Sequence, residues 1–267
     1  MGTFKRLLRS RKPYSAYRTS RAAQMSRKWT SVDEKRLEFY SKFIHPNDLC
    51  FDIGSNIGNR AKIFLKIVGP HGKVVLVEPQ EHCMKILQKA FSRYPSIYFE
   101  CKALGEKTGE AQLAISNELT VSSMSKNWIN SVKKTGRFGP ETVWDRSQKV
   151  EVTTLDYLID TYGVPSFIKI DVEGYEKEVI LGLSKSIQTC LSLEFTPEYL
   201  SSTFDCLDHL SQLGQISCNY SIGESMSFAL PEWAPQEGIR EALIQYENDI
   251  RFFGDVYIQL APDCLKK

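Results

Sequence analysis

The chain has 267 residues, of which 42% are hydrophobic and 25% are charged, and its formal net charge at pH 7 is +2. This composition is ordinary for a globular protein of one or two domains. It contains no apolar run of the roughly 20 residues that a membrane span needs, no apolar secretory signal is evident, and the seven cysteines include no C-x-x-C pair. We therefore expect a cytoplasmic protein with reduced thiols.

Positive charge is concentrated at the N-terminus. Residues 1–28 contain nine lysines and arginines and no acid, so the remainder of the chain is net acidic. We interpret residues 1–30 as a basic arm and residues 31–267 as a single domain. Such an arm could contact nucleic acid, an anionic membrane surface or an acidic partner. A helical extension without a partner fits the same pattern, and the arm lacks the regular apolar stripe of a membrane-surface helix.

The period of the hydrophobic residues predicts alternating helices and strands in the first half of the chain. A helix over residues 32–43 offers Val32, Phe39 and Phe43 for packing. Strands follow at residues 49–52, 73–77 and 97–101, helices at residues 57–68 and 80–91, and a hairpin arm at residues 110–115. The strand KVVLV at residues 73–77 is apolar after its first residue, which is typical of a parallel strand buried on both faces.

Residues 117–149 form the least regular segment, polar and rich in serine and lysine. A stretch of this length without regular structure is typical of a lid or a binding loop, and we predict such an insert here. Three aromatic residues could stack on a sugar or ring substrate, or pack onto the domain: Trp128, Phe138 and Trp144. Three cations could contact a phosphate-bearing acceptor, or lie in solvent: Lys133, Lys134 and Arg137.

The regular alternation resumes after this insert. Strands are predicted at residues 150–153, 166–170, 189–195 and 255–260, and helices at residues 155–162, 174–183, 197–213 and 239–246. The proline, glycine and serine content of residues 214–235 indicates loops. Strands that alternate with helices predict one α/β domain, a doubly wound and mainly parallel sheet with helices on both faces.

The turn after the first strand has the pattern D-x-G-x-N-x-G, formed by Asp52, Gly54, Asn56 and Gly58. A dinucleotide site needs small residues where Asn56 and Asn59 stand, so an NAD-dependent dehydrogenase is disfavoured. The pattern resembles the first motif of S-adenosylmethionine (SAM)-dependent methyltransferases, and asparagine tolerates the positive φ of such a turn. Glu78 ends the next strand, where a carboxylate could accept hydrogen bonds from both ribose hydroxyls.

A second group of acids follows the strand in FIKIDVEGYE, residues 167–176. In a doubly wound sheet this strand lies beside the first one, so Asp171 and Glu173 should face whatever binds at Asp52. Glu173 could alternatively cap the following helix. Glu194 ends the next strand, LSLEF. A carboxylate near a hydroxyl group can take its proton, and three clustered acids could instead bind Mg²⁺, so both uses stay open.

The chain resembles the FkbM-type methyltransferases between about residues 49 and 200. The shared motifs are FDIGSNIGN, VLVEPQ, CKALGEKTGE, VEVTTLDYLI, IKIDVEGYE and LSLEF. The resemblance implies a seven-stranded sheet and SAM-dependent O-methylation of a hydroxyl on a sugar or natural product. It places Asp171 near the methyl donor, and the three strand-end acids Asp171, Glu173 and Glu194 are our candidate catalytic residues. The implied cofactor-binding residues are Asp52, Gly54, Ser55, Asn56, Gly58, Glu78, Pro79, Ala103, Leu104 and Asp171.

Two other functions stay open on the sequence. A nucleic-acid methyltransferase would use the basic arm to hold phosphates, and its affinity would fall steeply with salt. The chain carries no nucleic-acid-binding motif beyond this charge. A non-catalytic binding protein could retain the fold, but the presence of all the acids expected of an enzyme makes it the weakest of the three.

Overall fold

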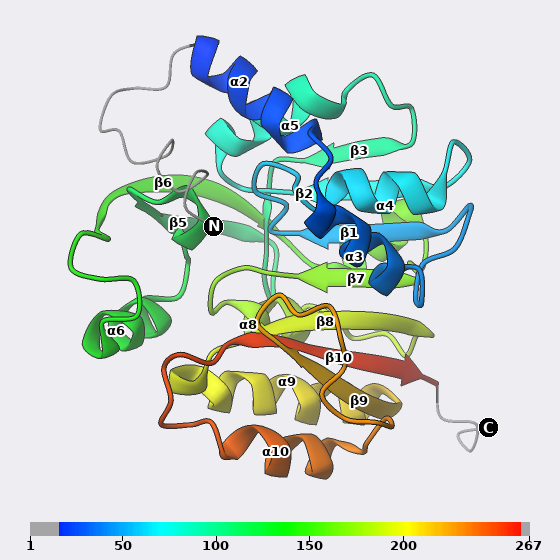
Figure 1. Ribbon diagram of the computed structural model, residues 1–267, viewed down its shortest axis with the longest axis vertical. Helices are drawn as coiled ribbons and strands as arrows, with labels where there is room; N and C mark the ends of the chain where they lie inside the picture. The colour runs from blue at the N-terminus through cyan, green and yellow to red at the C-terminus, as the bar shows by residue number, and fades with distance from the viewer. Residues whose placement is uncertain (1–15, 263–267) are drawn as a thin grey trace.

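The computed structural model describes residues 16–262 of the chain. Within these residues the main element is a seven-stranded sheet with the order β3-β2-β1-β7-β8-β10-β9 (Figure 1). Its strands are β1 (Leu49–Ile53), β2 (Lys73–Val77), β3 (Ile97–Glu100), β7 (Phe167–Ile170), β8 (Thr189–Phe195), β9 (Gln215–Ile222) and β10 (Gly254–Ala261). The predicted doubly wound α/β fold with seven strands is confirmed.

The first five strands in the order of the sheet are parallel, and β10 alone runs antiparallel to its neighbours β8 and β9. β1 lies between β2 and β7, with Asp52 opposite Leu76 on one side and Lys169 on the other. The predicted placement of the IKID strand beside the first strand is therefore confirmed. Carboxyl ends of β1, β2, β7 and β8 meet at one edge of the sheet.

Helices cover both faces of the sheet, and each face has its own hydrophobic core. One face carries α2 (Ala16–Arg27), α3 (Ser31–Tyr40), α4 (Ala61–Val68) and α5 (Glu81–Phe91). The other carries α7 (Leu155–Tyr162), α8 (Glu176–Leu181), α9 (Leu200–Leu213) and α10 (Gln236–Ile244). The helix predicted over residues 57–68 begins only at Ala61, and Ala61, Phe64 and Val68 are buried on its inner face, with Ile57 buried in the turn before it. Val32, which was expected to pack, is instead 44% exposed.

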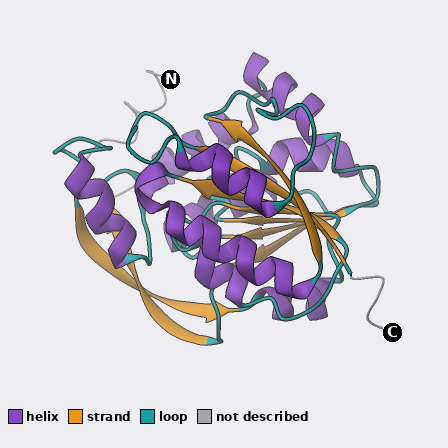
Figure 2. Cartoon of the chain, turned by 90° about the horizontal axis from the view of Figure 1, so that it is seen from below, coloured by secondary structure: helices purple, strands orange, loops and turns teal. Residues whose placement is uncertain are grey.

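The expectation that residues 117–149 lack regular structure is wrong. They contain the 3-10 turn η1 (Leu119–Val121), helix α6 (Lys126–Thr135) and the first half of strand β6 (Trp144–Thr153). β6 joins β5 (Gly109–Ser116) and β4 (Ala103–Leu104) in a second, three-stranded sheet. Figure 2 shows the long β5–β6 hairpin beside α6, to one side of the main sheet.

Two features explain why the hydrophobic pattern of the sequence did not predict α6 and the first half of β6. α6 has only three buried residues, Trp128, Ile129 and Val132, among polar and charged ones, and it is capped by Ser125 and by Gly136, at φ +73°. The first half of β6 is exposed or half-buried and therefore lacks an apolar period. Trp128 is the buried centre of the segment, and its ring lies 5.8 Å from that of Phe138 and 6.4 Å from that of Trp144. These three aromatic residues pack together.

The expectation of loops over residues 214–235 is wrong in its first part, which forms β9. Ser217, Asn219 and Ser221 gave this strand a polar appearance, although Asn219 and Ser221 are buried. The Asn219 side chain is satisfied by the backbone of Leu230: it accepts a hydrogen bond from the N–H and donates one to the carbonyl. Buried polar side chains, of which Asn219 has backbone partners, therefore obscured the apolar pattern of the strand.

The part of the basic arm that the structure describes is the helix α2, which packs along α5. Arg27 Nη1 donates to the carbonyls of Lys89 and Ala90 at 3.3 and 3.2 Å, a favourable place for a cation at the end of a helix. Residues 1–15 of the predicted arm lie outside the described residues. No helix among residues 16–262 has the length and the apolar character that crossing a membrane requires.

Candidate active site

A cavity of about 260 Å³ lies at the carboxyl ends of β1, β2, β7 and β8, where the main sheet faces the β5–β6 hairpin (Figure 1). Almost all of the predicted site residues line it: Asp52, Gly54, Ser55, Asn56, Glu78, Pro79, Ala103, Leu104, Asp171, Glu173 and Glu194. Gly58 does not. A Cβ on Gly58 would stand 2.5 Å from Phe91 Cε2, so this glycine serves the packing of the turn onto α5.

The turn after β1 is shaped by residues with positive φ. Gly54 has φ +80° and Asn56 has φ +49°, as expected for the asparagine. A Cβ on Gly54 would stand 1.8 Å from the carbonyl oxygen of Asp171, so only glycine fits here. The hydroxyl of Ser55 donates to the carbonyl of Asp52 and braces the same turn. Gly54 and Asp171, more than a hundred residues apart in the sequence, are therefore in close contact.

Glu78 and Asp52 are buried acids on the β1–β2 side of the cavity. The two carboxylate oxygens of Glu78 accept the backbone N–H groups of Asn56 and Gln80, both at 2.8 Å. Burial raises the pKa of Glu78 to about 7 and, against the nearby charge of Arg60, that of Asp52 to about 6. Asp52 Oδ2 is buried without a hydrogen-bond partner among the described residues. This side therefore retains free acceptor capacity for a ligand.

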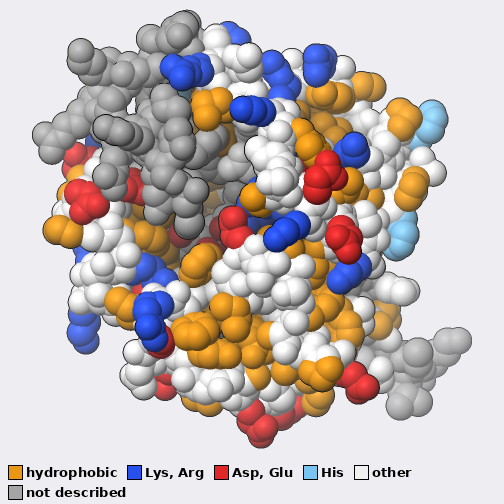
Figure 3. All heavy atoms as spheres, viewed as in Figure 1, with side chains coloured by type: hydrophobic (Ala, Val, Ile, Leu, Met, Phe, Trp, Pro, Cys, Tyr) orange, Lys and Arg blue, Asp and Glu red, His pale blue; other side chains and the backbone are white. Residues whose placement is uncertain are grey.

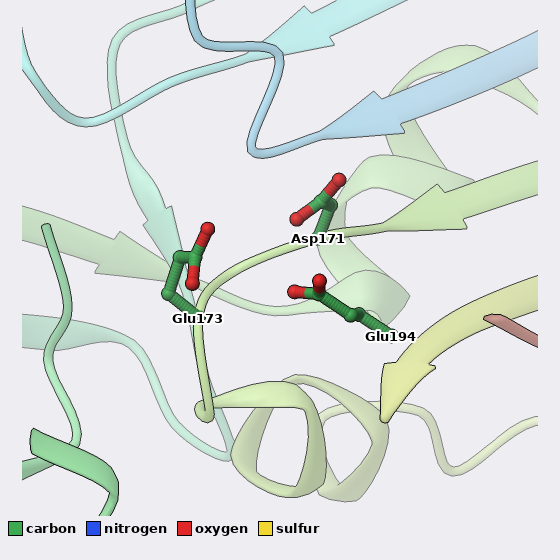
Figure 4. Close-up of side chains that lie close together, drawn as sticks. All are labelled: Asp171, Glu173 and Glu194. Atoms are coloured by element: carbon green, nitrogen blue, oxygen red, sulfur yellow. The ribbon is translucent and has the colours of Figure 1, made fainter. Parts of the chain in front are cut away.

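Asp171, Glu173 and Glu194 gather on the β7–β8 side. One carboxylate oxygen of each lies within 4.8 Å of the others, and Figure 4 shows the three groups around a shared space. Asp171 Oδ2 is 3.0 Å from Arg60 Nη1 and 3.6 Å from Lys169 Nζ. Although burial opposes it, these two cations hold the pKa of Asp171 below its usual value.

The other two acids have the opposite behaviour. Burial, with the charge of Glu194, raises the pKa of Glu173 well above its usual value. Burial, with the charge of Asp171, does the same for Glu194. The three acids therefore differ: the pKa of Asp171 is lowered by its two cations, whereas burial and like charge raise the pKa values of Glu173 and Glu194.

The turn after β7, which carries Asp171 and Glu173, is held by hydrogen bonds with two side chains. Glu173 and Gly174 have φ +57° and +83°. The carboxylate of Glu176 accepts the N–H groups of Val172 and Gly174 at 3.0 and 3.3 Å, and Ser123 Oγ donates to the carbonyl of Glu173 at 2.6 Å. Glu176, rather than Glu173, is therefore the acid that satisfies the backbone before α8, which leaves the Glu173 side chain to the cavity.

Sequence reasoning missed Arg60 and Lys169. Arg60 is the residue before α4 and lines the cavity. Lys169 is fully buried in β7, where the strand FIKI has no exposed position. A lysine inside a strand that is otherwise buried is the signal that could have found it, because a buried ammonium needs a carboxylate partner.

The comparison with known families identifies the family of the chain. Residues 52–221 match the family model described as the methyltransferase FkbM domain. The chain belongs to this family. The FkbM resemblance predicted from the motifs is confirmed, and this FkbM protein is a SAM-dependent methyltransferase. No curated protein is significantly similar to it in sequence.

Solved methyltransferase structures resemble this FkbM protein at low identity. The precorrin-6y C5,15-methyltransferase of Geobacter metallireducens GS-15 is 9% identical, with a TM-score of 0.42 over 84% of this chain and 87% of that one. The O-methyltransferase of Bacillus cereus, solved with S-adenosylhomocysteine (SAH), is 9% identical, with a TM-score of 0.44 over 96% of each chain. An O-methyltransferase of Streptomyces achromogenes involved in tomaymycin synthesis is 8% identical, with a TM-score of 0.43 over 97% and 96%.

The cavity residues of this FkbM protein fit SAM. The lining contains seven acids, Asp52, Glu78, Asp171, Glu173, Glu194, Glu224 and Asp255, against two cations, Arg60 and Lys102. An acidic lining suits a cationic cofactor. The unpartnered Asp52 Oδ2 and the remaining acceptor capacity of Glu78 are positions where polar groups of SAM can be satisfied.

Proposed function

We propose that this FkbM methyltransferase transfers the methyl group of SAM to a hydroxyl of an uncharged sugar or small natural product. The observation that carries the proposal is the cluster of three carboxyl groups on the β7–β8 side, within 4.8 Å of one another, in which Asp171 is paired with Arg60 and Lys169. A hydroxyl acceptor needs a group that takes its proton and groups that hydrogen-bond its other oxygens. The three acids provide both.

The β1–β2 side of the cavity would hold the cofactor. Asp52 and the turn at Gly54, Ser55 and Asn56 would surround its methionine part, and Glu78 with Pro79 would lie at its ribose. Ala103 and Leu104, both buried, would lie against the adenine. When bound, SAM supplies a methyl group on a positively charged sulfur, which is a reactive electrophile. Asp171, at the border of the two sides, would lie near this group.

Asp171 would receive the proton of the acceptor hydroxyl. As the oxygen–methyl bond forms and the sulfur–methyl bond breaks, the hydroxyl oxygen gains positive charge and its proton becomes strongly acidic. A carboxylate with a low pKa can accept such a proton, and Asp171 is ionised over the whole neutral range. Glu173 and Glu194, in their protonated forms, would donate hydrogen bonds to neighbouring oxygens of the acceptor.

A Mg²⁺ ion fits these residues poorly. Magnesium prefers an octahedral shell of oxygen ligands, but Asp171 Oδ2 is already in contact with the guanidinium of Arg60 and the ammonium of Lys169. A divalent cation would lie against these two positive charges. The proposed reaction therefore assigns no step to a metal, and transfer activity should persist in the presence of EDTA.

A phosphate-bearing acceptor, including a nucleic acid, is disfavoured by the charges near the cavity. Its lining is acidic, and none of the three insert cations belongs to it. Arg137 is bonded to Glu198 and to the carbonyl of Phe252, and Lys133 lies over the ring of Trp144. On the face in Figure 3, lysines and arginines are interspersed with acidic and hydrophobic side chains.

The proposal is tested by methyl transfer from isotope-labelled SAM to a panel of acceptors. The panel contains neutral sugars, phenols, a sugar nucleotide and a short RNA, each in buffer with and without EDTA. We expect a product heavier by one methyl group, carried on oxygen, with a neutral acceptor. Transfer only to the RNA or the sugar nucleotide would overturn the proposal, and the salt dependence of that transfer would then identify the role of the basic arm.

A further inference from the structure

Lys169 is a buried cation whose side chain reaches across the sheet. None of its surface is exposed. Its ammonium lies 2.7 Å from Asp255 Oδ1 on β10 and 3.2 Å from the carbonyl of Ile170, and it is 3.6 Å from Asp171 Oδ2. β8 separates β7 from β10, and the residue opposite Lys169 on β8 is Ser192, whose small side chain leaves room for the lysine.

Arg60 approaches Asp171 from the other direction. It stands at the start of α4, on the β1 side of the cavity, and its Nη1 lies 3.0 Å from Asp171 Oδ2. Arg60 and Lys169 therefore contact the same oxygen of Asp171. Both cations thus engage Oδ2, and Oδ1 is the other oxygen of a carboxylate whose side chain lies beside those of Glu173 and Glu194 (Figure 4).

We propose that Lys169 is a positioning residue of the methyl transfer: anchored by Asp255 and acting with Arg60, it fixes Asp171 Oδ2 so that Oδ1 is presented to the acceptor hydroxyl. This inference rests on the proposed function of Asp171. A lysine buried for stability alone needs one good partner, which Asp255 already supplies. The second contact, to the acid that lies within 4.8 Å of Glu173 and Glu194, is what a structural role leaves unexplained.

Two shells of charged and titratable groups surround this contact. Those that interact with Asp171 are Asp52 of β1, Arg60 before α4, Lys169 of β7, Glu173 and Glu176 after β7, and Glu194 of β8. Those that interact with the two cations are Tyr40 of α3 and Asp255 and Tyr257 of β10. Arg60 and Lys169 are the cations of this set, so removal of Lys169 leaves Asp171 with a single positive neighbour among them.

The test uses a double variant, because Lys169→Met alone would leave Asp255 buried without its cation and would destabilise the fold. Lys169→Met with Asp255→Asn removes both charges of the buried pair. Asp255→Asn alone is measured beside it, because Asp255 itself lines the cavity, and the effect assigned to Lys169 is the difference between these two variants. The matched control is Lys177→Met with Asp205→Asn, an exposed pair with the same Nζ–Oδ distance of 2.7 Å. Both double variants should fold, which circular dichroism and thermal unfolding establish before any kinetics.

Two measurements then decide. With the neutral acceptor of highest turnover in the panel, the Lys169 double variant should lose at least about tenfold in kcat while its KM and its affinity for SAH stay within about threefold, and the control should match the wild type. Independently of activity, the ¹³C carboxyl signal that disappears in Asp171→Asn should titrate at higher pH in the Lys169 double variant than in the wild type.

A wild-type kcat in the Lys169 double variant, or an unchanged titration of Asp171, would overturn the positioning role. Failure of the proposed function looks different. In that case the wild type binds SAH and methylates no hydroxyl acceptor, while the carboxyl signal of Asp171 still reports whether Lys169 controls this residue.

Discussion

The indole of Trp128 lies directly against Gly174, in the turn that carries the acids of the cavity. A Cβ on Gly174 would stand 2.1 Å from Trp128 Cγ and 2.3 Å from Trp128 Cβ. Trp128 belongs to α6, inside the segment that the sequence predicted as a lid or binding loop, and it is 2% exposed. Residues 117–149 therefore support the turn at Gly174 through the packing of Trp128. Whether they also move as a lid stays a prediction.

Gly174→Ala should destabilise the protein strongly. The residue has φ +83°, and its new methyl group would overlap Trp128, so strain and overpacking add. We expect the free energy of unfolding to fall by about 2–4 kcal/mol. Urea denaturation measures this. Gly109→Ala is the control, since a Cβ there meets no atom within 4 Å, and equal losses in the two variants would contradict the steric account.

Trp128→Ala should affect both stability and turnover. Truncation of this buried ring removes its contacts with Phe138 and Trp144 and should cost about 3–5 kcal/mol. Because the ring also holds the turn at Gly174, kcat should fall even at temperatures where the variant is folded. Kinetics at 15 °C, with folding verified by circular dichroism, measure this. A folded variant with wild-type kcat would show that the turn does not need the insert.

Arg137→Ala should change stability and leave the acceptor KM unaltered. Arg137 and Glu198 are less than a tenth exposed and form an ion pair, so the substitution would leave a buried carboxylate without its cation. We expect a loss of about 3 kcal/mol. In contrast, Lys149→Ala breaks the exposed pair with Glu110 and should cost under about 1 kcal/mol. An increased KM for a phosphate-bearing acceptor in Arg137→Ala would instead support the contact between Arg137 and such an acceptor that the sequence suggested.

The cofactor-free protein should be more stable at pH 5.5 than at pH 8. Burial raises the pKa of Asp52 to about 6 and the pKa values of Glu78 and Glu176 to about 7, whereas the unfolded chain titrates these groups near 4. Between these values the folded state binds more protons, so its free energy of unfolding falls as pH rises. His82, whose pKa burial lowers, acts in the opposite direction but is one group against three.

Thermal unfolding across this pH range, without cofactor, provides the measurement. The decrease should be on the order of a few kcal/mol, and Glu78→Gln together with Glu176→Gln should flatten the curve. Stability that rises from pH 5.5 to pH 8 in the wild type would show that these acids are ionised in the folded protein.

Strongly periodic elements were predictable from the sequence. The strands at residues 73–77 and 189–195 and the helix at residues 155–162 have the predicted bounds. The meeting of Asp171, Glu173 and Glu194 was predictable as well, because the carboxyl ends of adjacent parallel strands lie at one edge of a sheet. β9 was missed because several of its buried side chains are polar, and α6 because only Trp128, Ile129 and Val132 are buried in an otherwise polar and charged helix.

The charge partners inside the site could not be predicted from the sequence. Arg60 follows the glycine turn as an ordinary helix-start residue, and Lys169 reaches Asp255 on a strand that comes more than eighty residues later. Such a contact depends on strand order and on a small residue, Ser192, between the two. The hydrophobic pattern of the sequence does not reveal the strand order or which residue lies between the two strands' side chains. The opposite pKa shifts of Asp171 and of the pair Glu173 and Glu194 depend in part on these contacts.

The central claim is that Asp171 acts on the acceptor hydroxyl rather than only on the cofactor, and Asp171→Asn tests it most directly. The measurement pairs calorimetric titration with SAH and turnover of the neutral acceptor, with Asp205→Asn as the exposed control. We predict an SAH affinity within about threefold of the wild type and a turnover lower by about 10²- to 10⁴-fold. Turnover near that of the wild type, or a loss of SAH affinity as large as the loss of turnover, would contradict this account.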